Sequence, residues 1–314
     1  MKAAVLAAGL GTRLRPLTYT LPKALFPVLN RPVLGLILEQ AAAAGFTRVA
    51  VNTHHLAPLV HRFLEDRRFS GIDLRISHEP ELLGTGGGLR EMGKLLEGGP
   101  FLAVNSDVLT DLDFRKMFQD HRQGALTTLV VHDCSPYNNV WVEGHLVVAI
   151  GGDSPGGGAR PLAYTGVQVV SPGMIDYLPG TGEYDLVAAW RQALTAGETL
   201  AALVLEGHFW QDLGTREGYL SAHRRLLAGA APGLASFLPD LADPYIGPPG
   251  AIGSGVEFAG GVCLGAGVQV GAGAFLKNTV AWDRACIGPG VRLEDCLVAA
   301  GARVTESARG RTLV

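Results

Sequence analysis

Apolar runs and amphipathic segments alternate along the first two-thirds of the chain. The runs AAVLAA, RVAVNT, DLRIS, FLAVNS and ALTTLVV have the length and composition of buried strands. Between these runs, apolar residues recur with a helical period, which predicts helices near residues 34–45, 56–67, 86–97 and 114–122. Repeated strand–helix units favour a mostly parallel sheet covered by helices on both faces. The pattern therefore predicts an α/β domain.

A hairpin-like stretch follows near residue 140. Two short apolar segments, Val140–Val142 and Leu146–Ile150, flank Gly144, and the loop GGDSPGGGARP comes after them. Two interpretations fit this stretch: a lip that covers a second substrate, and an ordinary flexible hairpin. The sequence does not decide between them.

The domain then returns to its earlier pattern and ends. LAYTGVQVV predicts a strand, residues 184–197 a helix, and LAALVLEGHFWQDLG a strand that ends at Asp212. A last helix from Thr215 to about residue 228 completes a domain that we predict to cover residues 1–228. The proline-containing residues 229–244 have the composition of a linker.

Residues 245–314 follow a six-residue repeat. Apolar or aromatic residues recur every six positions, and the register continues after a slip of one residue: Ile246, Ile252, Phe258, Leu264, Val270, Leu276 and Trp282, then Ile287 and Leu293. Glycine often follows the apolar position. Such repeats build a left-handed parallel β-helix, in which each repeat forms one flat side. About three coils fit, and the long register argues against a disordered glycine-rich tail.

Composition limits the kind of protein. The chain has 314 residues, of which 47% are hydrophobic and 18% charged, so it is long enough for two domains with buried cores. Its formal net charge of -3 argues against a general nucleic-acid binder, because such proteins gather Lys and Arg into a basic face. No apolar stretch is long enough to span a membrane, and no cleavable signal precedes the first strand, so we expect a cytoplasmic protein.

The four cysteines carry no metal-site or redox pattern. They lie at Cys134, Cys263, Cys286 and Cys296, without a CxxC pair or a Cys/His cluster at zinc spacing. We expect them to be reduced and buried.

The segment from Gly9 to Lys23 has the composition of an anion-binding loop. It follows the first strand, and its glycines allow a tight turn and a close approach of backbone to ligand. It lacks the GK[ST] of a Walker A loop and the third glycine of a dinucleotide fingerprint, because Leu14 occupies that place. What remains is the Thr12 hydroxyl, the guanidinium of Arg13 and the ammonium of Lys23. Arginine grips two phosphate oxygens and lysine neutralises one place, which suits a triphosphate.

The complete set of motifs resembles the sugar-1-phosphate nucleotidylyltransferases. The resemblance rests on the motifs LAAGLGTRLRPLT with PKALFPV, Glu79 with LGTGGG at 83–88, NSDV at 105–108, YTGVQVV at 164–170 and WQDLGT at 210–215. They occur in the order and spacing of that family, and the hexapeptide tail follows in its usual place. The resemblance implies a Rossmann-like nucleotidyltransferase domain with a C-terminal left-handed β-helix.

The resemblance also implies a reaction and the residues that perform it. The family joins a sugar 1-phosphate to a nucleoside triphosphate by direct attack on the α-phosphorus, releases pyrophosphate, and supplies precursors of cell walls and polysaccharides. Asp107 and Asp212 match its metal ligands, and Mg²⁺ prefers such carboxylates together with phosphate oxygens and water. Arg13 would hold the departing pyrophosphate and Lys23 would neutralise the α-phosphate.

Two further residue sets follow from the resemblance. The nucleotide would be bound by Leu6, Ala8, Gly9, Gly11, Thr12, Arg13, Glu79, Gly84 and Thr85. The sugar phosphate would be bound by Asn105, Thr165, Gly166, Glu183 and Arg160. Arg160 is included as a substitute for a lysine. Many relatives have a Lys-Pro pair that binds the sugar phosphate, but here residues 152–155 are Gly-Asp-Ser-Pro. Ser106 is a second departure, since glycine is usual before the first metal ligand.

The sequence leaves more than one possibility for the nucleotide base and for the type of function, and it suggests an oligomeric state. The Glu79 carboxylate suits the two adjacent donors of guanine but also the single donor of uracil, so both GTP and UTP stay open. Within the family, the motifs are most similar to N-acetylmuramate 1-phosphate uridylyltransferases and mannose 1-phosphate guanylyltransferases. A catalytically silent nucleotide- or sugar-sensing module is the alternative function. An acyltransferase β-helix is disfavoured because no histidine lies beyond His223. We expect the β-helix to make the protein a homo-oligomer.

Overall fold

The computed structural model describes residues 1–66, 69, 71–238 and 241–314. The chain forms two compact units. The first contains Met1–Leu10, Ile37–Ser106 and Leu112–His208, and the second contains Gly11–Leu36, Asp107–Asp111 and Phe209–Val314. This division differs from the predicted boundary near residue 228, because two early segments pack with the C-terminal part of the chain. Residues 239–240 of the predicted linker lie outside the described residues.

The first unit is built on a nine-stranded sheet with the order β5-β4-β1-β6-β11-β8-β12-β10-β9. Its strands are β1 (Lys2–Leu6), β4 (Arg48–Thr53), β5 (Asp73–His78), β6 (Phe101–Asn105), β8 (Thr127–His132), β9 (Val140–Glu143), β10 (Leu146–Ile150), β11 (Arg160–Val170) and β12 (Leu200–Val204). The predicted hairpin is β9 and β10, and Gly144 between them has a φ of 59°.

The sheet is mixed and less uniformly parallel than the repeated units suggested. β5, β4, β1 and β6 are parallel, as is β8 with β12, whereas β11 is antiparallel to β6, β8 and β9. The reason is that β11 follows the β9–β10 hairpin, which is itself antiparallel to its neighbours, and so it enters the sheet without a helical crossover. The predicted α/β class is confirmed.

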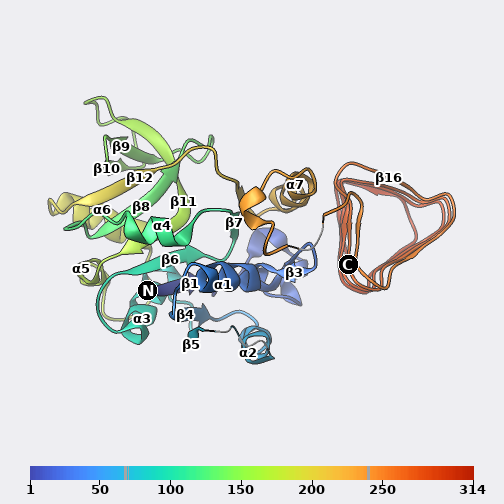
Figure 1. The fold of residues 1–314 in the computed structure, drawn as a ribbon, viewed down its shortest axis with the longest axis horizontal. Coiled ribbons are helices and arrows are strands. Elements are labelled where there is room, and N and C mark those ends of the chain that lie inside the picture. Colours follow the sequence, from blue (N-terminus) through green and yellow to red (C-terminus); the bar gives the residue numbers. More distant parts are fainter. Residues whose placement is uncertain (67–68, 70, 239–240) are drawn as a thin grey trace. The chain divides into compact units, whose positions relative to one another are not determined.

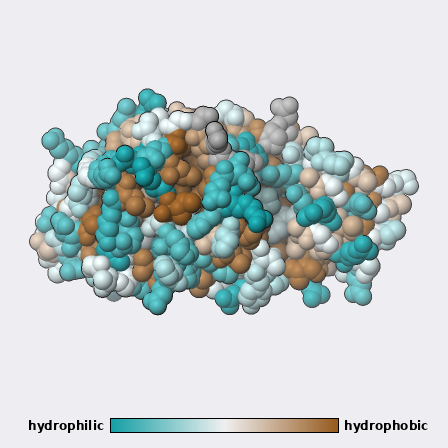
Figure 2. Space-filling model, turned by 90° about the horizontal axis from the view of Figure 1, so that it is seen from below, coloured by the Kyte–Doolittle hydropathy of each residue, from teal (hydrophilic) through white to brown (hydrophobic). Residues whose placement is uncertain are grey.

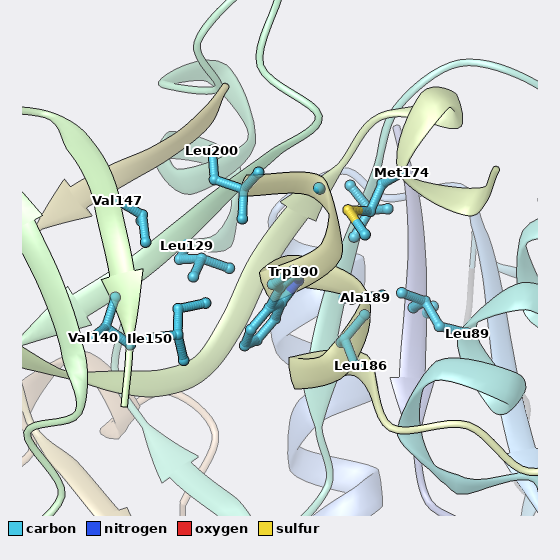
Figure 3. Close-up of a cluster of buried hydrophobic side chains, with 14 of the residues drawn as sticks. Leu89, Leu129, Val140, Val147, Ile150, Met174, Leu186, Ala189, Trp190 and Leu200 are labelled. Atoms are coloured by element: carbon cyan, nitrogen blue, oxygen red, sulfur yellow. The ribbon is translucent and has the colours of Figure 1, made fainter. Parts of the chain in front are cut away.

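Helices pack against this sheet much as the periodicity predicts. They are α1 (Val33–Ala43), α2 (Ala57–Asp66), α3 (Gly84–Leu96), α4 (Phe114–Gln119), α5 (Pro172–Ile175) and α6 (Leu186–Thr195). α3 packs on β1, β4 and β5, and α6 packs on β10 and β12. Figure 3 shows one part of the core, where Trp190 of α6 lies among side chains of β8, β9, β10 and β12. Residue 67, the end predicted for α2, lies outside the described residues.

The second unit begins with short elements. Three 3₁₀ turns, η1 (Thr12–Leu14), η2 (Leu17–Tyr19) and η3 (Lys23–Leu25), are followed by the strand pair β2 (Pro27–Val28) and β3 (Arg31–Pro32). β7 (Val108–Thr110) pairs with β13 (Trp210–Asp212), and α7 (Arg216–Leu227) and η4 (Pro232–Leu234) come next. Leu234 is fully buried, so the predicted linker contains an ordered, packed turn.

The remainder of the second unit is a three-sided parallel β-helix (Figure 1). One side holds β14 (Tyr245–Ile246), β17 (Cys263–Leu264), β20 (Val280–Ala281), β23 (Leu297–Val298) and β26 (Thr312–Leu313). The second holds β15 (Ala251–Ile252), β18 (Gln269–Val270), β21 (Cys286–Ile287) and β24 (Arg303–Val304). The third holds β16 (Glu257–Ala259), β19 (Phe275–Lys277), β22 (Arg292–Glu294) and β25 (Ala308–Arg309).

The β-helix is longer than the three coils predicted, because β14 to β25 complete four coils and β26 begins a fifth. The corner after β19 consists only of Asn278 and Thr279, so the inward residue of β20 is Ala281, five positions after Leu276. The sequence analysis gave that place to Trp282, which packs against Phe26 instead. A second short corner follows β22, so the next inward residue after Leu293 is Val298. Two successive shortenings break a six-residue register, and the last coil was missed for that reason.

Glycine serves the β-helix in two ways. At the corners a residue with positive φ recurs in each coil, for example Gly255, Gly273 and Gly290. Directly after the strands the reason is space: a Cβ at Gly253, which follows β15, would lie 2.5 Å from the backbone nitrogen of Ala272 in the next coil. The coils therefore stack too closely there for any side chain.

Two of the expectations drawn from composition can be compared with the structure. None of the four cysteines forms a disulfide among the described residues, but only Cys263 and Cys296 are buried, while Cys134 and Cys286 are partly exposed because they lie at a loop and on an outward strand position. No helix in the described part of the chain is long and apolar enough to cross a membrane. On the face shown in Figure 2, hydrophilic and hydrophobic residues are interspersed.

Candidate active site

Lys23 and Asp107 are joined by an ion pair in the second unit. The Lys23 ammonium donates to Oδ2 of Asp107 at 2.8 Å, and the two side chains are 11% and 38% exposed. Lys23 begins η3, directly after Pro22, whose ring fixes the backbone φ. The pair brings together two residues that are 84 positions apart, both of which the sequence analysis assigned to the reaction.

Contacts between its own residues hold the loop that carries Lys23 in a compact conformation. Gly11 has a φ of 60°, and a Cβ there would lie 2.8 Å from Cγ2 of Thr18 and 3.3 Å from Cβ of Lys23. The Thr18 hydroxyl donates to the Gly11 carbonyl at 3.1 Å. Gly11 is thus required both for its backbone conformation and for the space that Thr18 and Lys23 occupy. Thr12 and Arg13 lie exposed in η1 between these contacts.

The second carboxylate, Asp212, lies on the strand beside Asp107. β13 is antiparallel to β7, with Asp212 opposite Val108, and the Leu213 N–H donates to the Asp107 carbonyl at 2.9 Å. Asp107, directly before β7, therefore lies one position along this ladder from Asp212. Oδ1 of Asp212 accepts a hydrogen bond from the Gly214 N–H, which fixes the carboxylate at the start of the turn into α7.

Gly214 is a site residue that the sequence reasoning did not single out. A Cβ at this position would lie 2.6 Å from Oδ1 of Asp212 and 3.1 Å from Cζ of Arg13, and it would meet Nη2 of Arg13 as well. The Arg13 guanidinium and the Asp212 carboxylate thus approach the same point. The only sequence signal was its place in the WQDLGT motif.

The carboxylates fit a divalent metal by their chemistry. No group of three or more His, Cys, Asp or Glu residues that could hold a metal ion occurs in the described ranges. Mg²⁺ commonly uses only one or two protein carboxylates and takes its other ligands from water and substrate phosphates. Asp107, which pairs with Lys23, and Asp212, which lies close to the Arg13 guanidinium, would supply two such carboxylates.

A second group of predicted residues lies at the carboxyl ends of β1 and β6 in the first unit. Leu6 and Asn105 are partners in the parallel ladder, and the Ser106 N–H donates to the Leu6 carbonyl at 3.0 Å. Ala8 is buried, whereas Gly9 is exposed and a Cβ there would meet no atom within 4 Å. The chain is therefore open to a ligand at Gly9, at the strand ends where α/β sheets bind ligands.

Glu79, which the sequence analysis assigned to the nucleotide, is buried and forms its hydrogen bonds within the protein. It is 1% exposed; Oε1 accepts from the Asn52 amide at 2.7 Å and Oε2 from the Leu83 N–H at 3.0 Å. The Asn52 carbonyl oxygen accepts from the Ala7 N–H at 2.6 Å. Glu79 and Asn52 thus tie the end of β1 to the loop before α3. Asn52 was missed, although a polar residue in the apolar run RVAVNT signalled it.

The glycines at the start of α3 are needed for packing. A Cβ at Gly88 would lie 2.8 Å from Oε1 of Glu79, and one at Gly84 would lie 2.7 Å from the Tyr184 carbonyl. The Thr85 hydroxyl donates to Asp185 at 3.4 Å and accepts from the Leu186 N–H at 3.1 Å. These glycines therefore let α3 pack closely on its neighbours, and Thr85 uses its hydroxyl within the fold.

The predicted sugar-side residues separate into two places. Thr165 and Gly166 lie in β11 at an irregularity of its pairing with β8; Gly166 has a φ of 84°, and the buried Thr165 hydroxyl donates to the Val130 carbonyl at 2.8 Å. Bulges of this kind redirect strands next to active sites. The exposed Glu183 lies beside Gly84, with its Cγ 3.2 Å from where a Cβ on that glycine would be. Arg160 begins β11, roughly 16 Å along the strand from Thr165 at about 3.3 Å per residue, so it is not grouped with Thr165.

The comparisons with known proteins identify the family. A model of the nucleotidyl transferase family matches residues 2–141. A UTP–glucose-1-phosphate uridylyltransferase from Synechocystis sp. is 30% identical, with 95% of this chain and 87% of the relative covered. The chain belongs to the nucleotidyl transferase family. The prediction of a sugar-1-phosphate nucleotidylyltransferase is thereby confirmed at the level of the family, whose enzymes generally use a divalent metal.

Other members of the family differ in base and in length. An N-acetylmuramate alpha-1-phosphate uridylyltransferase from Neisseria meningitidis is 34% identical over 68% of this chain and 94% of its own length. A probable mannose-1-phosphate guanylyltransferase from Oryza sativa is 30% identical over 98% of this chain and 84% of its own.

Among solved structures, HddC from Yersinia pseudotuberculosis, in complex with GMP-PN, has a TM-score of 0.61 at 20% identity and covers 72% of this chain and 99% of its own. UDP-glucose pyrophosphorylase from Acinetobacter baumanii has a TM-score of 0.60 at 21% identity, over 70% of this chain and 91% of its own. These structures show that the nucleotidyltransferase fold is shared.

Proposed function

We propose that this protein condenses a sugar 1-phosphate with a nucleoside triphosphate, UTP or GTP, and releases pyrophosphate. The observation that carries the proposal is the pairing of Lys23 with Asp107 beside Asp212 in the second unit. An ammonium paired with one carboxylate, with a second carboxylate one ladder position away, suits highly charged phosphates and a divalent ion. Family membership supports the same reaction.

The residues of the second unit act on the phosphates. Lys23 places its ammonium where negative charge grows as the sugar phosphate attacks the α-phosphorus. Arg13, exposed and beside Gly214, binds the pyrophosphate as it leaves, since a guanidinium binds two phosphate oxygens at once. Asp107 and Asp212 would hold Mg²⁺, and the bound ion would supply neutralisation of phosphate charge and polarisation of phosphoryl oxygens. No covalent intermediate is required, so catalysis rests on positioning and charge stabilisation.

The residues of the first unit bind the remaining parts of the substrates. We assign the nucleoside to the backbone from Leu6 to Gly9, which is open at Gly9, and to the loop that Glu79 stabilises. Asn105, Thr165 and Gly166 lie at or near strand ends, and we assign them together with Glu183 to the sugar phosphate. The position of Arg160 at the far end of β11 speaks against its replacing the missing lysine.

The decisive experiment is a grid of nucleoside triphosphates against α-sugar 1-phosphates with Mg²⁺, scored by pyrophosphate release. We expect release with UTP or GTP and at least one sugar phosphate, and none when the metal is chelated. The variant Asp107→Asn should abolish release, and Lys94→Met, which alters an exposed helix lysine, should leave it unchanged. Nucleotide binding without turnover across the whole grid would favour the silent sensing module instead.

We also propose that the β-helix supports a homo-oligomer. Ile246 and Ile252, in its first coil, are large apolar side chains that are each 37% exposed. Covering such side chains with a second subunit would remove apolar surface from water. Light scattering at micromolar concentration tests this proposal, and Ile252→Ser should reduce the measured mass if the first coil is the interface. A monodisperse monomer would contradict it.

A further inference from the structure

An aromatic cluster in the second unit connects residues 23–30, the segment that begins at Lys23, with the β-helix. It consists of Phe26, directly after η3, Tyr219 of α7, and Trp282, directly after β20. The ring of Phe26 meets those of Trp282 and Tyr219 edge-on, with centroids 4.7 Å and 5.9 Å apart. All three are at most 4% exposed. Edge-to-face packing fixes the relative orientation of such rings as well as their distance.

A chain of hydrogen bonds runs through the same cluster. The Trp282 indole N–H donates to the Tyr219 hydroxyl at 3.1 Å, and that hydroxyl donates to the Pro27 carbonyl. Burial raises the pKa of Tyr219 well above its usual range, so the phenol stays protonated and can donate. Because these groups are buried, removing the Tyr219 hydroxyl leaves the Trp282 indole N–H without its acceptor and the Pro27 carbonyl without this donor. The backbone directly after Phe26 is thus fixed by a side chain of α7 that the β-helix orients.

A third contact holds the end of the segment. Leu29 has a φ of 47°, an uncommon backbone conformation for a non-glycine residue. Its N–H donates to Nε2 of His223 at 3.3 Å, and Nδ1 of the same ring bonds to the Tyr219 carbonyl at 2.9 Å. His223 therefore supports a strained turn while being positioned by the residue that binds Pro27.

The fixed segment is short enough to transmit this support to Lys23. The Phe26 N–H donates to the Lys23 carbonyl at 3.0 Å, and the Leu25 N–H donates to the Pro22 carbonyl at 2.8 Å. One hydrogen-bonded turn thus separates the anchored Phe26 from Lys23. The other end of the Lys23 side chain is held by Asp107. A shift of Phe26 would move the Lys23 backbone against a fixed partner.

We propose that Trp282 of the β-helix, acting through Phe26 and Tyr219, is a positioning residue for Lys23. This inference rests on the proposed function, because it assigns the consequence to the step that Lys23 assists. It makes the β-helix a working part of the phosphate-handling site in addition to any role in assembly. Phosphoryl transfer depends strongly on the placement of charged groups, so a displacement of about 1 Å is costly.

The test uses three variants of the full-length protein and one control. Trp282→Leu removes the ring and the indole N–H, Trp282→Phe keeps a ring without the N–H, and Tyr219→Phe removes only the hydroxyl. Leu293→Ala is the control, because Leu293 is fully buried in the β-helix core, in a different cluster from Trp282. It should lower the melting temperature without displacing Phe26.

Two measurements are made on each protein below its melting temperature. We expect Trp282→Leu to lower kcat by roughly tenfold to a hundredfold, with KM for the sugar phosphate within about twofold, and Trp282→Phe to recover part of the loss. Amide hydrogen exchange of residues 23–30 should quicken in Trp282→Leu and Tyr219→Phe, and keep its wild-type rate in Leu293→Ala.

The outcomes separate this inference from the proposed function. Unchanged exchange of residues 23–30 in Trp282→Leu, or an equal loss of kcat in Leu293→Ala, would overturn the positioning role. Wild-type protein that releases no pyrophosphate with any substrate pair would overturn the proposed function and the catalytic consequence. In that case the exchange rates would still decide whether Trp282 fixes the segment.

Discussion

The Lys23 ammonium lies 2.8 Å from a carboxylate oxygen of Asp107. Lys23 is largely covered, with 11% of its side chain exposed, while Asp107 stays 38% exposed. The ion pair holds the ammonium in a defined place. In the proposed reaction, an incoming phosphate would meet a cation that is already oriented, which is the condition for strong charge stabilisation of a transition state.

Replacing Lys23 tests this arrangement directly. We expect Lys23→Met to lower kcat at least about a hundredfold, since removing one preorganised charge-stabilising group typically costs that much. The fold should survive, because one partly exposed ion pair contributes little to stability. Circular dichroism and the melting temperature check this. Near-normal turnover in Lys23→Met would contradict the assignment.

Gly214→Ala should disturb Arg13 and Asp212 together. A methyl group at this position would lie 2.6 Å from Oδ1 of Asp212 and meet the Arg13 guanidinium, so at least one must move. We expect kcat/KM for the nucleotide to fall by about tenfold or more. Gly180→Ala is the matched control, because a Cβ there would meet no atom within 4 Å. Equal kinetics in the two variants would show that the crowding is harmless.

Glu79→Gln distinguishes packing from base recognition. Both carboxylate oxygens of Glu79 accept hydrogen bonds within the fold, from Asn52 and Leu83. An amide in that place cannot accept both, so we expect the free energy of unfolding to fall by about 1–3 kcal/mol, measured by urea denaturation. The ratio of UTP to GTP turnover should stay constant. A changed ratio would show that Glu79 contributes to recognition of the base.

Acid should destabilise the protein through His223. Burial lowers the pKa of His223 to about 4, below its usual value near 6.5, so the folded state binds fewer protons than the unfolded state between these values. The contribution is complete above about pH 6.5 and is lost as the pH falls towards 4, at up to about 1.4 kcal/mol per pH unit.

The difference between wild type and His223→Gln isolates this group from the carboxylates. The variant should be less stable at pH 7 but show a shallower decline of unfolding free energy between pH 6.5 and 4.5. His132, whose pKa burial and the neighbouring His208 also lower to about 4, contributes a slope that both proteins share. Parallel pH profiles would contradict the assignment.

Thiol labelling should divide the cysteines into two pairs. Cys263 and Cys296 are buried, and burial raises the pKa of each thiol, which suppresses the reactive thiolate. Cys134 and Cys286 are partly exposed. We expect N-ethylmaleimide to modify the second pair in the native protein and all four in urea, as read by mass spectrometry. Rapid native labelling of Cys263 would show that the first side of the β-helix opens.

Local patterns were sufficient for most elements of the fold. The helical periods placed α1, α2, α3, α6 and α7 to within a few residues, because amphipathic spacing and caps such as Thr215, whose hydroxyl accepts from the Gly218 N–H, act over a single turn. The six-residue repeat predicted the β-helix for the same reason. It misplaced one inward residue, Trp282 for Ala281, after the short corner Asn278–Thr279, and it was lost after Leu293, where Asp295–Cys296 shortened a second corner, since a fixed period cannot follow successive deletions.

The motifs of the sequence therefore determined the residue types of the site: Arg13, Lys23, Asp107 and Asp212 were named from their chemistry and family resemblance. Only the tertiary structure decided what each one touches. It turned Glu79 inward to Asn52, moved Arg160 to the far end of β11, and set Phe26 against Trp282 of the β-helix. Spacing along the chain describes contacts within a turn or a strand, but these contacts join residues up to 256 positions apart through burial and hydrogen bonding, which no local pattern encodes.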